Sequence, residues 1–134
     1  MRGSLQLSDN LRSLCDRLAT VLIEQAARRG RSLTYTELLP MIGFASEYGS
    51  PGRDLLTSQL LPQIGHECHR CSVPILSTLA VSAKTRKPEE WFRILMIDEL
   101  KLVSLKNAEE WRRFVDLEQQ RALSYWSKAP GWVA

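Results

Sequence analysis

A regular stripe of apolar residues near the start of the chain constrains the fold more than any other feature. The stripe consists of Leu11, Leu14, Leu18, Leu22 and Ala26. Residues that recur every three or four positions share one face of an α-helix. Ser8 is suited to cap the start of such a helix, and Gly30 is suited to end it, because glycine readily adopts the left-handed backbone found after helices. The pattern therefore predicts an amphipathic helix over residues 8–29.

Two more helices are predicted in the next forty residues or so. In "TYTE", Thr34 and Glu37 stand three residues apart, the spacing of a capping box, so a short helix is expected to begin there and to end at Gly43. A short extended piece, "SLT", precedes it. A third helix is expected from about residue 51 to Arg70, with a kink at Pro62. Its apolar stripe consists of Leu56, Leu60, Ile64, Cys68 and Cys71.

The second half of the chain contains two apolar runs joined by a basic turn. "VPILSTLAVSA" (73–83) and "WFRILMI" (91–97) both fit strands, and "KTRKPEE" between them fits a turn, so a β-hairpin is expected. Asn107 is suited to cap a final helix over about 107–127. The order of helix, extended piece, helix, helix, hairpin and helix is the plan of a winged helix.

These elements predict an α+β fold that is mostly α, with three helices, a β-hairpin wing and a long C-terminal helix. A length of 134 residues suits one domain. In that domain a helix-turn-helix and hairpin core occupies about 8–97, followed by the C-terminal helix.

Two short stretches resemble a known family. "LTYTELLPMIG" (33–43) resembles the "TTYGELAxLxG" stretch of the alkylguanine-DNA alkyltransferases and their alkyltransferase-like relatives, and "VPIL" (73–76) is similar to the strand before their active-site Pro-Cys-His-Arg. The resemblance covers residues 33–85 and implies a DNA-binding winged helix. By position, Tyr35 matches a tyrosine that contacts a phosphate, and Arg53 an arginine that props open the duplex. Leu79 stands where the family has its reactive cysteine, so binding without alkyl transfer is implied.

The segment "HECHRC" (66–71) has the residue types of a metal or redox site. At about 100° per residue, its two histidines and its two cysteines point to opposing sides of a helix, so the four cannot converge on one ion. Cys68 and Cys71 continue the apolar stripe and are expected in the core, with His66 and His69 in water. The sequence also has no glycine-rich phosphate loop and no motif that places a histidine beside a serine. We therefore expect no metal, no cofactor and no enzymatic activity.

Charge and aromatic residues leave two classes of function open. The net charge is +3, and cations cluster in "RRGR" (28–31) and "KTRK" (84–87). A module that binds nucleic acid is expected to use Tyr35, Arg53, Lys84, Arg86 and Lys87. The alternative is a small inhibitor or adaptor of another protein, such as an immunity protein, an antitoxin or an anti-defence factor. Its expected anchors are Tyr125, Trp126 and Trp132, although these aromatic residues can instead close the core beneath the last helix.

The sequence also bears on location. No apolar run approaches the ~20 residues needed to span a bilayer, and no secretory signal is recognisable, so a cytoplasmic protein without a membrane partner is expected.

Overall fold

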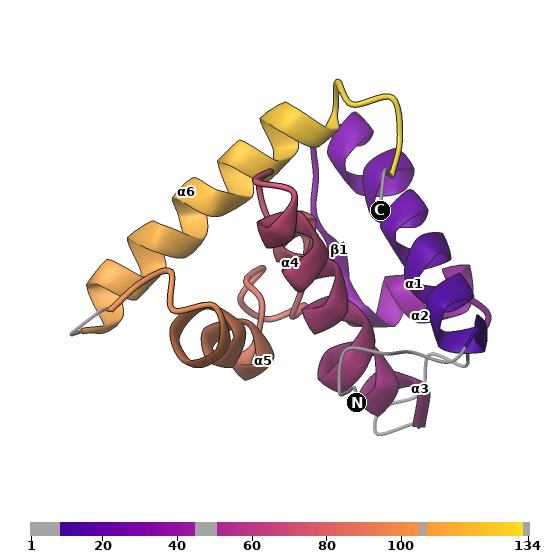
Figure 1. The fold of residues 1–134 in the computed structure, drawn as a ribbon, viewed down its shortest axis with the longest axis horizontal. Coiled ribbons are helices and arrows are strands. Elements are labelled where there is room, and N and C mark those ends of the chain that lie inside the picture. The colour runs from indigo at the N-terminus through magenta and orange to yellow at the C-terminus, as the bar shows by residue number, and fades with distance from the viewer. Residues whose placement is uncertain (1–8, 45–50, 105–106, 133–134) are drawn as a thin grey trace.

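The first helix is the N-terminal wall of the fold (Figure 1). The computed structural model describes residues 9–44, 51–104 and 107–132, so the predicted cap at Ser8 lies outside the described residues. Helix α1 (Asp9–Val21) continues through a π-helical turn, η1 (Leu22–Ala26), and a 3-10 turn, η2 (Ala27–Arg29). Gly30 then adopts a left-handed backbone with φ of 67°, which confirms the predicted end of this helix.

The capping box predicted at "TYTE" is present. Strand β1 (Leu33–Thr34) leads directly into helix α2 (Tyr35–Met41). The backbone N–H of Glu37 donates to Thr34 Oγ1 at 3.1 Å, and the backbone N–H of Thr34 donates to Glu37 Oε1 at 2.9 Å. Because each side chain satisfies a backbone donor of the other, the start of α2 is fixed by local sequence.

The predicted third helix is confirmed over residues 51–70. It consists of α3 (Pro51–Leu55), a π-helical turn η3 (Leu56–Leu60) and α4 (Leu61–Arg70). In η3 the N–H of Leu61 donates to the carbonyl of Leu56, five residues back. Pro62 follows at once inside this continuous helix, where its missing N–H leaves one backbone hydrogen bond of the helix unmade.

The predicted β-hairpin is not formed by the two apolar runs. In the first run the chain makes a 3-10 turn, η4 (Leu76–Leu79), and a short strand, β2 (Ala80–Val81). Strand β2 pairs in parallel with β1, with Leu33 opposite Ala80. The second run is helical, as α5 (Glu90–Arg93) and a π-helical turn η5 (Ile94–Glu99). The strand prediction for 91–97 is therefore wrong.

The helical outcome for 91–97 has a physical reason. The buried residues of this run are Trp91, Phe92, Leu95 and Met96. Their spacing puts them on one helical face, whereas a half-buried strand would bury alternate residues. Glu89 and Glu90 also stand at the N-terminal end, where acidic side chains favour a helix. A short apolar run is compatible with both a strand and a helix, so the sequence pattern alone did not decide between the two for residues 91–97.

The C-terminal helix lies across the rest of the molecule. Helix α6 (Ala108–Trp126) begins at Asn107, whose Oδ1 accepts the backbone N–H of Glu110 at 2.9 Å, so both the predicted cap and the predicted helix are confirmed. It packs on η4 and on η2, and Figure 1 shows it as a diagonal bar beside the end of α4 and the end of the N-terminal helix that leads into β1. The described residues are mostly helical with one small two-stranded sheet, which agrees with an α+β, mostly α fold.

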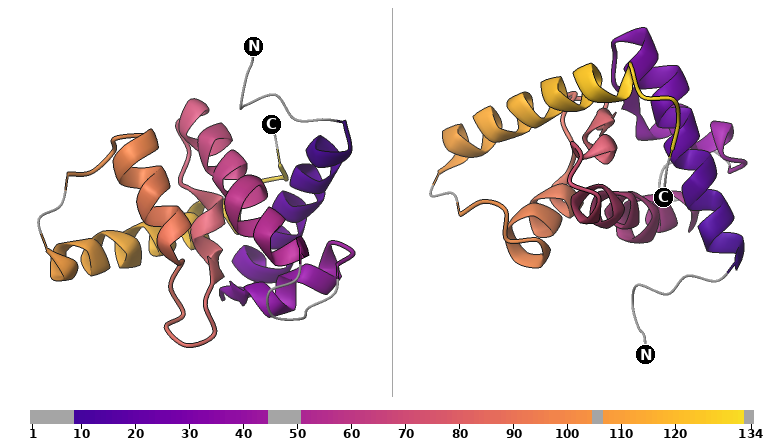
Figure 2. Two further views of the ribbon diagram at one scale, coloured as in Figure 1. Left: turned by 90° about the horizontal axis from the view of Figure 1, so that it is seen from below. Right: turned by 45° about the horizontal axis from the view of Figure 1, so that its top comes forward.

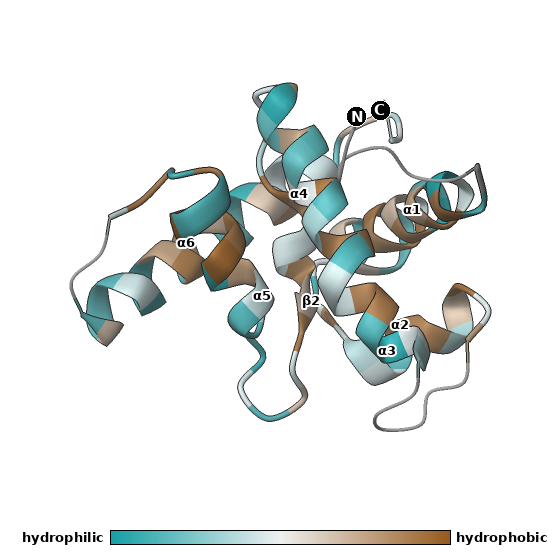
Figure 3. Ribbon diagram, turned by 60° about the horizontal axis from the view of Figure 1, so that its bottom comes forward, coloured by the Kyte–Doolittle hydropathy of each residue, from teal (hydrophilic) through white to brown (hydrophobic). Residues whose placement is uncertain are grey.

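One hydrophobic cluster joins α1, α2, the third helix, α5, η5 and α6. Residues 82–88, which follow β2 and which we call the basic loop, project from this body (Figures 2 and 3).

Candidate nucleic-acid interface

Tyr35 is buried and fastens the end of the basic loop. Its ring is 1% exposed, and its hydroxyl oxygen accepts the backbone N–H of Glu89 at 2.9 Å and the indole N–H of Trp91 at 2.8 Å. Burial raises the pKa of Tyr35 to about 12. A hydroxyl enclosed in this way does not reach a phosphate on the surface. The contact that the family resemblance implied for Tyr35 is therefore not available in this structure.

Arg53 also serves the loop. Its guanidinium lies 5.0 Å from the centre of the Tyr35 ring and forms an ion pair of 3.4 Å with Glu89 Oε1. Its side chain is 21% exposed. A cation held over an aromatic face and against a carboxylate is partly neutralised before any ligand arrives. Arg53 thus joins the start of the third helix to the segment after the loop.

Lys87 faces helix α6 instead of solvent. Its ammonium forms an ion pair with Asp116 and donates to Gln119 Oε1 at 3.2 Å. The amide of Gln119 in turn donates to the carbonyls of Thr78 at 3.0 Å and Arg86 at 3.4 Å. Three of the five residues predicted to bind nucleic acid therefore hold the basic loop in place.

Lys84 and Arg86, the remaining two predicted residues, lie at the tip of the loop and are exposed. The backbone N–H of Ser82 donates to the Lys87 carbonyl, and that of Arg86 to the Ser82 carbonyl, both at 2.9 Å, so the tip is closed on itself. Arg86 has a left-handed φ of 58°. The ammonium of Lys84 has no hydrogen-bond partner within the described part of the chain.

The fold brings the two basic clusters of the sequence together. One guanidinium nitrogen of Arg86 donates to both the carbonyl and the hydroxyl of Ser32 at 3.0 Å, which places it beside Arg31. Hydrogen bonds from Thr34 are the main cause that lowers the pKa of Glu37, and the charges of Arg31 and Arg86 both add to it. We call the surface formed by Arg31, Lys84 and Arg86 the basic face.

Arg31 belongs to one of the two cation clusters in the sequence but was not among the predicted site residues. The pairing of β1 with β2 aligns residues 47 apart in the chain, and it brings the "RRGR" turn next to the "KTRK" loop. No local pattern indicates such a long-range pairing, because each strand has two residues. The signal in the sequence was the pair of cation clusters, one next to each strand.

The three predicted protein-binding anchors differ in their exposure to solvent. Trp126 is 1% exposed and donates its indole N–H to the Pro74 carbonyl at 2.9 Å, so it closes the core and is not an exposed anchor. Trp132 is half-buried, with its ring 5.7 Å from that of Trp126. Tyr125 is 42% exposed, and its ring is nearly perpendicular to that of Trp126, with the two ring centres 4.9 Å apart.

"HECHRC" forms the last turn of α4 and the residue after it. Cys68 is buried, and burial raises the pKa of its thiol to about 12. Cys71 is exposed, so its predicted place in the core is wrong: the helix ends at Arg70, and the chain turns at Ser72 with φ of 58°. His69 is exposed, whereas His66 is partly covered and pairs with Glu99 at 2.8 Å.

Among the described residues, no group of three or more histidine, cysteine, aspartate or glutamate side chains is placed to hold a metal ion. Within residues 9–44, 51–104 and 107–132, no helix combines the length and the apolar character needed to cross a membrane.

Comparison of the chain with protein-family models, with curated proteins and with solved structures found no match.

Proposed function

We propose that this protein is a non-catalytic, winged-helix-like module that binds the phosphate backbone of nucleic acid through the basic face. The observation that carries the proposal is the contact of Arg86, in the loop that also contains Lys84, with Ser32, the residue next to Arg31, because it joins two basic turns that are far apart in the sequence. Phosphates attract clustered lysine and arginine side chains whatever the base sequence.

The order of elements supports this proposal up to the tip of the loop. Helix, strand, helix, helix, strand and loop follow one another as α1, β1, α2, the third helix, β2 and residues 82–88. The segment that follows the loop is the helix α5, whereas the segment that follows the wing of a winged helix is a strand. The basic loop then takes the place of the wing, held by Tyr35, Arg53 and Lys87 instead of by strand pairing.

The arrangement favours contact with the backbone over reading of bases. Arg86 is already oriented by Ser32, and a guanidinium so placed can donate its remaining N–H groups to phosphate oxygens. Lys84 adds a point charge at the tip. In the first turns of the third helix, the hydroxyls of Thr57 and Ser58 donate to the carbonyls of Arg53 and Asp54, so these donors are used within the helix. We therefore expect weak dependence on base sequence and strong dependence on salt.

Fluorescence anisotropy with a labelled 20-base-pair DNA duplex and with a matched RNA hairpin tests the proposal. The double variant Lys84→Glu/Arg86→Glu should lower the affinity by more than about tenfold at 0.1 M salt, because two attractive contacts become repulsive. The control is Arg17→Glu/Arg113→Glu, which makes the same change of charge at exposed sites on α1 and α6. Unchanged binding by the first variant, or an equal loss in both, would contradict the proposal.

A small protein-binding inhibitor or adaptor is the second candidate function. The observation that favours it is the exposure of Tyr125, an aromatic side chain on the surface of α6. The burial of Trp126 counts against it, because that side chain was one of its three expected anchors.

A further inference from the structure

A hollow lies between the basic loop and the first half of helix α6. Its volume is about 410 Å³, within the range of about 300–1,000 Å³ that is common for ligand pockets. The loop contributes Thr85, Lys87 and Pro88 to one wall, and α6 contributes Trp111 and Arg112 to the other. None of the three residues of the basic face lines this hollow, so it is a separate feature of the same loop.

The two walls of the hollow are tied to each other. Lys87 forms its ion pair with Asp116 of α6, and the amide of Gln119 donates to the Arg86 carbonyl at 3.4 Å. Within the loop, the backbone N–H of Lys87 donates to the hydroxyl of Thr85 at 3.2 Å. These contacts hold the loop against α6, so the hollow is formed before any ligand arrives.

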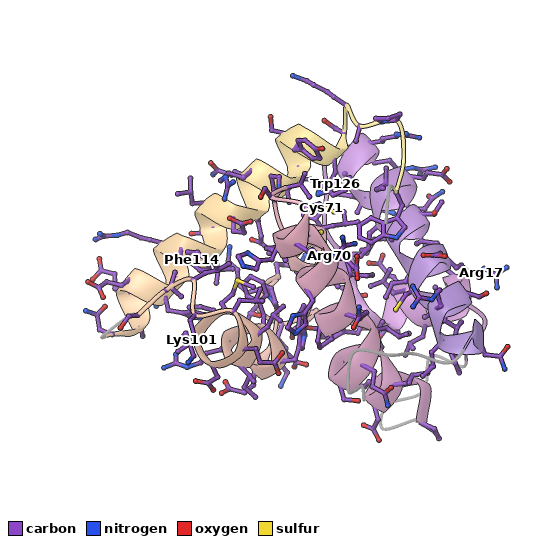
Figure 4. All side chains as sticks on the ribbon, in the orientation of Figure 1. Arg17, Arg70, Cys71, Lys101, Phe114 and Trp126 are labelled. Atoms are coloured by element: carbon purple, nitrogen blue, oxygen red, sulfur yellow. The ribbon has the colours of Figure 1, made fainter. Side chains whose placement is uncertain are left out.

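Trp111 gives the hollow an aromatic side chain in a fixed position. Its ring centre lies 5.7 Å from that of Phe92 and 5.6 Å from that of Phe114, and the guanidinium of Arg93 lies 5.8 Å from it. Figure 4 shows Phe114 on the side of α6 that faces the helical segment before Lys101. Trp111 is nevertheless only half-buried, and its indole N–H makes no hydrogen bond within the described part of the chain. Part of the indole is therefore available to a bound group.

The hollow also carries positive charge. Its described lining residues include the cations Lys87 and Arg112 and no acidic side chain. Lys87 is already paired with Asp116, but Arg112 is exposed and has no hydrogen-bond or ion-pair partner among the described residues. The neighbouring Arg113, in contrast, is paired with Glu109 at 2.8 Å. Arg112 is thus a free cation beside Trp111.

The hollow adjoins the tip of the basic loop. Thr85, which lines it, stands between Lys84 and Arg86 in the chain, and consecutive Cα atoms are about 3.8 Å apart. A nucleic-acid backbone bound at the tip would therefore pass the hollow, where Arg112 is the next cation. The bases of a duplex are paired and stacked inside it, whereas those of a single strand are free to stack on aromatic side chains.

We infer that the hollow receives a base of single-stranded nucleic acid whose phosphates lie on the basic face. The inference rests on the proposed function and deepens it, because it names an unpaired strand as the preferred ligand. The base contacts the exposed part of Trp111, and Arg112 binds a phosphate beside it.

Fluorescence anisotropy with a labelled 20-nucleotide oligothymidine tests this inference. The reference is a strand of the same length made of abasic residues, which has the phosphates but no bases, and an oligouridine of that length tests RNA in parallel. The wild-type chain should bind at least one of the two base-bearing strands about tenfold more tightly than the abasic strand, as expected for a base stacked on an aromatic side chain.

Two variants assign the preference to the hollow. Trp111→Leu should remove most of it and leave affinity for the abasic strand within about twofold, with circular dichroism to check the fold. Arg112→Gln changes an exposed side chain without a partner, so folding is not at stake. It should reduce the slope of log affinity against log salt concentration for oligothymidine by about 0.7, the value for one phosphate of a single strand. The matched control Arg113→Gln, next to it but outside the hollow, should leave the slope unchanged.

Three outcomes would overturn the inference. They are equal binding of base-bearing and abasic strands, a preference that persists in Trp111→Leu, and an equal change of slope in Arg112→Gln and Arg113→Gln. If duplex binding still depends on Lys84 and Arg86, these outcomes leave the basic face intact and remove the hollow alone. Absence of binding to every strand and to the duplex would overturn both proposals.

Discussion

The base and the tip of the basic loop contain similar residues but have different partners. At the base, Tyr35, Arg53 and Lys87 are satisfied by Glu89, Trp91 and Asp116. At the tip, Lys84 and Arg86 are exposed, and Arg86 makes its contact with Ser32. The lysines at 84 and 87 belong to the same tetrapeptide. A cluster of cations in a sequence therefore does not show how many of its side chains are exposed to a ligand.

The largest expected effect comes from the base of the loop. Tyr35→Phe removes the acceptor of two hydrogen bonds and leaves the N–H groups of Glu89 and Trp91 without their partner. We expect the free energy of unfolding to fall by about 3 kcal/mol, measured by urea denaturation. The matched change Tyr125→Phe, at an exposed hydroxyl, should have an effect below about 0.5 kcal/mol. If both changes lowered the free energy of unfolding equally, the structural role assigned to the Tyr35 hydroxyl would be wrong.

A second expectation concerns alkaline pH. Burial raises the pKa of Tyr35 from 10.0 to about 12, so below pH 10 the hydroxyl is protonated in both the folded and the unfolded chain. Between pH 10 and 12 the unfolded chain loses this proton first, and stability should fall by about 1.4 kcal/mol per pH unit from this group. The thiols of Cys15 and Cys68, raised from 9.0 to about 12 by burial, add to the loss above pH 9.

Urea denaturation from pH 8 to 11 measures this dependence. The slope above pH 10 should be shallower in Tyr35→Phe than in the wild-type chain, because that variant lacks the titrating hydroxyl. An unchanged slope would show that Tyr35 does not ionise preferentially in the unfolded chain.

A third expectation isolates the tip. Lys84→Met should reduce the slope of log affinity against log salt concentration for the duplex by about one, since one phosphate contact is lost. The free energy of unfolding should change by less than about 0.5 kcal/mol, because the ammonium has no partner among the described residues. A marked loss of stability in this variant would place Lys84 with the base of the loop.

The smallest effect on duplex binding is expected at Lys87. Lys87→Met removes the ion pair with Asp116 and should lower the free energy of unfolding by about 0.5–1 kcal/mol, the range for partly exposed pairs. The salt slope of duplex binding should stay as in the wild-type chain. A reduced slope with unchanged stability would reverse the roles assigned to Lys84 and Lys87.

Features that depend on neighbouring residues were predictable from the sequence. The capping box of Thr34 and Glu37, the stop at Gly30 and the cap at Asn107 each rest on contacts within a few residues. Features that depend on distant partners were not. The burial of Tyr35 results from Glu89 and Trp91, more than fifty residues away, and the exposure of Cys71 results from the turn at Ser72.

The candidate site likewise could be predicted only where it depends on neighbouring residues. Lys84 and Arg86 were named as cations of a predicted turn, and both are exposed. The contribution of Arg31 and the structural use of Arg53 and Lys87 both depend on which segments the fold brings together. Such pairing is decided by packing across the whole chain.

The two-residue sheet has a consequence for the order of folding. Joining β1 to β2 closes a loop that contains α2 and the third helix, and the entropy lost in such closure grows with loop length. A ladder with two residue pairs repays little of that cost by itself. We therefore expect the strands to pair after the enclosed helices have packed, so the basic face would be assembled late, and its two turns would be apart in any partly folded chain.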